Sequence, residues 1–135
     1  MIDKVNEVFT EVATQVRSEH PHVKKVIGEY VRNPSEFPVV TLDEIQNVTV
    51  DRLEDSSNEE TYVGVMYRLQ TFSNKQSGKK AEARAIFATA DKVMLGLGFR
   101  RITYTTTPEI YESTIYSITA TYEAIIRADG VVFKR

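Results

Sequence analysis

The stretch from Tyr62 to Arg127 constrains the fold most, because a strand, a helix, a glycine stop and two more strands follow one another there. Residues 62–72 alternate with a period of two, which is typical of a strand with one buried face. The residues expected on that buried face are Val63, Val65, Tyr67 and Leu69. A sheet that is hydrophobic on one face needs a covering layer, and the helix that follows can supply it.

That helix follows a polar turn over residues 73–78, for which Ser73 or Ser77 is the expected helix cap. Its apolar stripe consists of Ala83, Ile86, Phe87, Ala90, Val93, Met94 and Leu97. Gly96 and Gly98 can both adopt the left-handed conformation that ends a helix. Strands are then expected over 99–107 and 113–127, the second being the longest of the chain.

The first sixty residues add a second helix and two more strands. The helix is expected over 2–18, on a stripe formed by Ile2, Val5, Phe9, Val12, Ala13 and Val16. Strand-rich segments follow over 23–31 and 39–50, and Val39 to Leu42 is expected to be the central piece. The predicted fold class is therefore α+β, a mostly antiparallel sheet packed with two main helices. We expect a single domain over 1–135, with the sheet and central helix in 23–135.

Composition limits the chemistry. The chain has no cysteine, which excludes thiolate nucleophiles and cysteine-ligated zinc. Charges interrupt the apolar pattern at the N-terminus, and no run of about 18 apolar residues occurs, so we expect neither export nor a membrane-embedded protein. The net charge of −2 also argues against a dedicated DNA-binding module.

The charges are unevenly distributed along the chain. Residues 1–60 contain 13 acidic and 6 basic residues, whereas residues 61–135 contain 6 acidic and 11 basic residues. Strands from both halves interleaved in one sheet would mix these charges over the surface. Alternatively, the protein has an acidic side and a basic side, which suits face-to-back contacts between copies and closure into a ring.

No set of residues has the spacing of a catalytic or cofactor site. His20 and His22 beside Glu19 are two imidazoles without a distant third ligand, which favours a solvated turn over a metal site. Ser113 and Ser117 lie in an alternating strand without a glycine-flanked elbow. We therefore expect no catalytic residue, no cofactor and no metal, and we expect that the protein is not an enzyme.

Two charged clusters are the candidate interface residues. The basic cluster near the start of the central helix consists of Lys75, Lys79, Lys80 and Arg84. The acidic cluster consists of Glu54, Asp55, Glu59 and Glu60, in a segment over 51–60 that we expect to be an exposed loop or the tip of a hairpin. Cations at a helix N-terminus oppose the helix dipole, so the basic cluster is either a solvated face or a contact with an acidic neighbour or a phosphate backbone.

Residues 38–135 contain a characteristic order of elements. These are the strand YVGVMYRLQTFSNKQSG, the helix KKAEARAIFATADKVMLGLGF, the pair Arg100 and Arg101, and the final strand ending in TATYEAIIRADGVVFKR. In order and length these elements resemble the tail terminator and tail-completion proteins of long-tailed bacteriophages. The resemblance implies a homohexameric ring that caps the tail tube protein and offers a docking surface to the head-tail connector. It also implies a virion protein made in the host cytoplasm, with DNA passing through the lumen without sequence-specific binding.

Three alternatives stay open beside this expectation. The acidic loop also suits a neighbouring head-tail joining component of the neck. A small protein-binding module would use tyrosines as contact residues, namely Tyr62, Tyr67, Tyr104, Tyr111, Tyr116 and Tyr122. An enzyme would use carboxylates such as Glu112 and Glu123, although neither has a spacing or partner that marks it.

Overall fold

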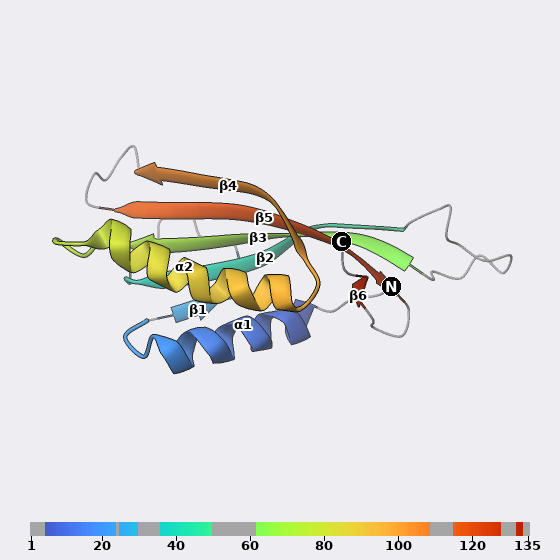
Figure 1. The fold of residues 1–135 in the computed structure, drawn as a ribbon, viewed down its shortest axis with the longest axis horizontal. Helices are drawn as coiled ribbons and strands as arrows, with labels where there is room; N and C mark the ends of the chain where they lie inside the picture. Colours follow the sequence, from blue (N-terminus) through green and yellow to red (C-terminus); the bar gives the residue numbers. More distant parts are fainter. Residues whose placement is uncertain are drawn as a thin grey trace, which may run out of the picture.

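The structure is a computed structural model, and it describes residues 5–23, 25–29, 36–49, 62–108, 115–127 and 132–133 (Figure 1). Its elements in chain order are α1 (Val5–Glu19), β1 (Lys25–Ile27), β2 (Val39–Thr49), β3 (Tyr62–Ser73), α2 (Lys79–Gly96), β4 (Arg100–Pro108), β5 (Tyr116–Arg127) and β6 (Val132–Phe133).

The strands form one sheet in the order β1-β2-β3-β5-β4, and β6 pairs with β5. β1 and β2 run parallel, and every other pair in this sheet is antiparallel. This arrangement confirms the predicted α+β fold with a mostly antiparallel sheet and two helices. β3 is the middle strand of the main path and β2 lies beside it, so the segment expected to be central is one strand removed from the middle.

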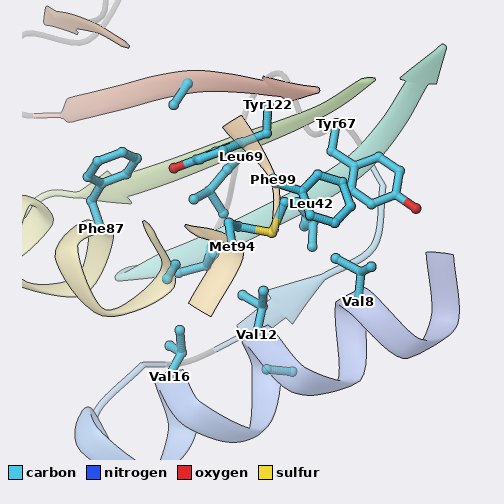
Figure 2. Close-up of a cluster of buried hydrophobic side chains, with 14 of the residues drawn as sticks. Val8, Val12, Val16, Leu42, Tyr67, Leu69, Phe87, Met94, Phe99 and Tyr122 are labelled. Atoms are coloured by element: carbon cyan, nitrogen blue, oxygen red, sulfur yellow. The ribbon is translucent and has the colours of Figure 1, made fainter. Parts of the chain in front are cut away.

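Both helices lie along the same face of the sheet and contact each other (Figure 1). α2 packs over β3 and β5, and α1 packs beside it over β2. One hydrophobic cluster fills the space between the helices and the sheet, and Figure 2 shows Val8, Val12 and Val16 of α1 directed toward Met94 and Phe99. Burying each such side chain contributes about 1.5–3 kcal/mol.

Helix α1 buries Val8, Val12, Ala13 and Val16. Val8 was absent from the predicted stripe, whereas Val5 and Phe9 are only partly buried at the edge of the core. The buried face is therefore rotated slightly relative to the prediction. The expected residues 2–4 of this helix lie outside the described residues.

Helix α2 is terminated by Gly98, one of the two glycines that were expected to end it. Gly98 has a φ of 100°, and its N–H donates to the carbonyl of Leu95 at 3.1 Å. The N–H of Phe99 donates to the carbonyl of Met94 at 3.1 Å, which completes a Schellman motif. Gly96 is an ordinary helical residue without a positive φ, so the expectation of two left-handed glycines is wrong for that position.

The alternation predicted for the long strands is confirmed. β3 buries Val63, Val65, Tyr67 and Leu69 on the helix-covered face, and every second residue of β5 packs beside them. β5 is not the single longest strand, because β3 also has 12 residues. In the segment expected as a strand over 23–31, β1 covers residues 25–27, and residues 24, 30 and 31 lie outside the described part of the chain. The short β6 was not predicted.

Candidate interaction surfaces

The predicted basic cluster lies around the first turns of α2. Lys75, Lys80 and Arg84 are exposed and Lys79 is half-buried. The turn before the helix carries Lys75, and the other three residues occupy the helix itself, so the structure brings all four to one end of α2.

Helix α2 begins at a glycine and not at a serine cap. Gly78 is the N-cap, with a φ of 92°, and no side chain caps the helix. The expectation that Ser73 or Ser77 caps the helix is therefore wrong. Positive φ favours glycine, and the backbone carbonyl of Gly78 accepts the N–H of Glu82 at 2.9 Å.

Ser73 instead donates its hydroxyl hydrogen bond to Glu82 Oε1 at 2.7 Å. This contact fixes a carboxylate in the first turn of α2, where negative charge interacts favourably with the helix dipole. Glu82 thus offsets part of the repulsion between the dipole and the neighbouring cations. The basic cluster can persist at this helix end because an acidic residue shares the same turn.

The two histidines join the turn after α1 to α2. His20 Nε2 is hydrogen-bonded to Thr89 Oγ1 at 2.8 Å, and His22 Nε2 lies 3.5 Å from Glu82 Oε2. The imidazole rings meet edge to face at 5.9 Å. Within the described residues no group of three potential metal ligands comes together. The histidines therefore hold the two helices in register at this end.

The acidic cluster of Glu54, Asp55, Glu59 and Glu60 lies outside the described residues, as do Ser113, Glu112 and Tyr111. Ser117 is buried in the sheet, and Glu123 lies 4.0 Å from Arg100 Nη1.

Tyr67 and Tyr122 are core residues, whereas Tyr104 is 43% exposed and Tyr116 is half-buried. Of the four proposed contact tyrosines whose side chains the structure describes, Tyr104 is therefore the exposed one.

The face of the sheet opposite the helices carries an ordered row of polar pairs that sequence reasoning missed. Arg68 on β3 forms a bidentate pair with Asp43 on β2, at 3.2 and 2.7 Å. In the next rung, Gln70 contacts Thr41 and Thr119, each at 3.3 Å. These contacts satisfy polar groups across three strands and keep their side chains in fixed positions.

A second polar cluster joins α2 to the β4 and β5 side of the sheet. The buried Tyr122 hydroxyl donates to Asp91 Oδ1 at 2.5 Å, and Arg101 donates to Asp91 Oδ2 at 3.0 Å. Burial, followed by the hydrogen bond to Asp91, raises the pKa of Tyr122 well above its usual range. Beside this cluster the Arg101 guanidinium lies 5.8 Å from the Tyr104 ring, and that ring packs edge to face on Phe87.

Strand β4 forms an edge of the sheet. Among the described strands it pairs with β5 alone, so the other side of this nine-residue strand has no strand beside it (Figure 1). Ile102, at an irregularity in the pairing, is 44% exposed, and Tyr104 is 43% exposed. An edge strand with exposed apolar side chains is a template for pairing with another chain.

No family model matches this chain, and no curated protein matches it either. The resemblance to phage tail terminators therefore stays a prediction. No helix among the described residues combines the length and apolarity needed to cross a membrane.

Proposed function

We propose that this protein is a structural component of a phage virion, a tail terminator that forms a ring on the end of the tail tube. Its partners are further copies of itself, the tail tube protein and the head-tail connector, with DNA passing through the ring. It is made in the host cytoplasm and ends in the tail or neck of the virion. On this proposal its polar groups form contact surfaces and do not take part in catalysis.

The observation that carries the proposal is the outer edge of β4, beside which no described strand lies. A protein that works as a monomer usually protects such an edge with charges, proline or a covering segment. Here Arg100 and Arg101 lie at the start of the strand and Pro108 lies at its end, but between them Ile102 and Tyr104 expose apolar surface. A subunit of a permanent assembly can leave this edge open, because a neighbouring subunit or flanking tail protein covers it.

The sheet also has the rigidity that a ring subunit needs. The polar pairs of Asp43 with Arg68, and of Gln70 with its two threonine partners, fix the face that the helices leave uncovered. Among the described residues of that face, Asp43 and Arg68 neutralise each other's charge. This property suits either a lumen that DNA passes without binding or a flat contact with the tube.

The experiment is a measurement of mass. Purified protein is examined by mass photometry and negative-stain electron microscopy over a range of concentrations, alone and with isolated tail tubes. The proposal predicts discrete rings, or capping of tube ends. A protein that stays monomeric at high concentration and ignores both tubes and connectors would show that the proposal is wrong.

A matched pair of variants tests the role of the β4 edge. Ile102→Lys should reduce assembly while the fold is kept, since exposed substitutions usually change stability by no more than about 0.5 kcal/mol. Leu95→Lys is the control, because Leu95 is equally exposed, at 46%, but belongs to helix α2 and not to the edge strand. If both variants assemble like the wild type, the β4 edge is not a contact surface.

One alternative is favoured by the same edge. A small binding module could add a peptide strand to β4, with Tyr104 as a contact residue. That protein would be a monomer that captures a peptide, so the mass measurement also separates the two functions. A head-tail joining component of the neck is the remaining variant of the proposal, and binding to isolated connectors in preference to tubes would identify it.

A further inference from the structure

A groove runs along the helical layer between α1 and α2. It consists of two adjoining hollows of about 400 and 310 Å³ that share Glu11 and Leu97. Its floor is apolar and includes Val8, Val93 and Phe99. A groove of this kind suits an elongated occupant that offers apolar surface along its length.

Acidic residues border this groove on the side of α1. Glu7, Glu11, Gln15 and Glu19 recur at four-residue steps, so they follow one stripe of the helix and three of the four carry negative charge. Lys92 is the base on the opposite wall. The three glutamates give this wall of the groove negative charge, which attracts a cationic occupant.

Gly96 keeps the α2 side of the groove open. It has no positive φ, and a Cβ placed on it would meet nothing within 4 Å. Neither backbone conformation nor packing within the chain therefore requires glycine there, although alanine is the better helix former. A missing side chain at the groove wall leaves room for close approach by an occupant.

We infer that the groove between α1 and α2 binds the basic start of α2 from a second copy of this chain. Lys75, Lys80 and Arg84 of the incoming copy are exposed and complement the glutamate stripe in charge. Lys and Arg side chains can lay their aliphatic stems on an apolar floor while their charged ends reach carboxylates at the rim. The inference rests on the proposed function, because it names a second contact of that assembly beside the β4 edge.

The two surfaces lie toward opposite ends of α2. The basic cluster surrounds the first turns, from Lys79, whereas the groove extends along the last turns to Gly96 and Leu97. Arg84 and Thr89, the nearest members of the two surfaces on α2, are about 7.5 Å apart along the helix axis, and no residue belongs to both surfaces. A contact between two different surfaces is heterologous, and such contacts close into rings when the rotation per subunit permits.

A charge-swap experiment tests this contact. The variants are Glu11→Lys with Glu19→Lys in the groove, Lys80→Glu with Arg84→Glu in the basic cluster, and the combination of all four. Each double variant should raise the concentration for half-maximal assembly by at least about tenfold, and the combination should return it to within about threefold of the wild type. If the double variants lose assembly and the fourfold variant does not regain it, the proposed pairing is wrong.

Controls with the same change in charge are available elsewhere on the surface. The control variants are Arg17→Glu and Glu29→Lys. Arg17 is an exposed residue of α1, and Glu29 is an exposed residue after β1. These variants should assemble as the wild type does. Assembly of the wild type should also weaken between about 0.05 and about 0.5 M salt, because salt screens contacts between exposed charges.

Two substitutions of one residue test the groove without changing its charge. Gly96→Leu places a branched side chain in the groove and should abolish assembly, whereas Gly96→Ala should preserve it. Circular dichroism should show both variants folded. Normal assembly of Gly96→Leu would overturn the inference.

Zero-length carbodiimide cross-linking identifies the contact directly. Peptides that join Lys80 to Glu11 or Glu19 should form in the assembled fraction, and in mixtures of isotope-labelled and unlabelled protein they should include pairs that join the two kinds of chain. Rings that lack these links and tolerate every groove variant would overturn the groove contact and leave the proposed function standing. A wild-type protein that never associates would overturn both.

Discussion

Replacement of Tyr122 by phenylalanine tests how much the polar cluster beneath α2 stabilises the fold. The Tyr122 ring is fully buried, and its hydroxyl donates to Asp91 Oδ1 at 2.5 Å. Phenylalanine keeps the ring and removes only the hydroxyl. The substitution therefore removes one charge-assisted hydrogen bond between β5 and α2 with little change in packing.

The expected loss follows from the surroundings of Asp91. A hydrogen bond to a charged group contributes about 1.5–3 kcal/mol, and removing its donor leaves a carboxylate oxygen that water must reach. The Asp91 side chain is 15% exposed and Arg101 still donates to its other oxygen at 3.0 Å, so the remaining charge is not isolated. We expect a loss of about 1.5–3 kcal/mol, or about 5–11 °C in Tm for a chain of this length.

Urea unfolding followed by circular dichroism measures this change, at protein concentrations below those at which the protein associates. The midpoint should fall while the m-value stays constant. Tyr104→Phe is the matched control, because its ring packs on Phe87 but its hydroxyl has no hydrogen-bond partner among the described residues. A shift for Tyr122→Phe as small as that of the control, within about 0.5 kcal/mol, would refute the reasoning.

Three further predictions concern pH, the core and the uncovered sheet face. The raised pKa of Tyr122 means that the folded state holds this proton more tightly than the unfolded state, so stability should decline as pH rises above about 10, by up to about 1.4 kcal/mol per unit. Titration of unfolding free energy should show a smaller decline in Tyr122→Phe. Ile86→Asp places a lone charge in the core, where Ile86 is fully buried, and should leave the chain unfolded by circular dichroism at 25 °C, whereas Ile86→Val should cost only about 0.5–1.5 kcal/mol. A double-mutant cycle of Asp43→Ala and Arg68→Ala in urea should give a coupling of about 0.5–3 kcal/mol, and additive effects would mean that the bidentate pair is not stabilising.

The regular elements could be predicted because burial imposes a period on the sequence. Val63, Val65, Tyr67 and Leu69 alternate in β3 because the helices cover one face of the sheet. The helix α2 was equally clear from its stripe. β1 and β6 were harder, since strands of three and two residues are too short to establish a period.

The errors have local physical causes. Ser73 was expected to cap α2, but its hydroxyl donates to the Glu82 side chain and the backbone starts the helix at Gly78. Sequence rules for caps identify residue types and cannot show which acceptor a hydroxyl will choose. The order of the sheet was also beyond the sequence, because β3 pairs with β5 across an intervening helix and strand.

The candidate surfaces were predicted in part. The basic cluster was recognisable because four cations lie within ten residues, and the structure brings them to one helix end. The pair of Asp43 and Arg68 could not be recognised in the sequence, because their contact depends on the register of β2 and β3. That register shifts between Glu44 and Gln46. The groove beside α1 was also missed, since it depends on the packing of two helices that the sequence places far apart.

The pairing of β3 with β5 also has a consequence for synthesis on the ribosome. β3 ends at Ser73, but its partner begins only at Tyr116 and ends at Arg127. At about 5–20 residues per second, a ribosome needs roughly 3–11 s to deliver the missing strand. During that interval the nascent chain exposes what will be the middle of its sheet, so crowding of neighbouring ribosomes on one messenger favours pairing between unfinished chains.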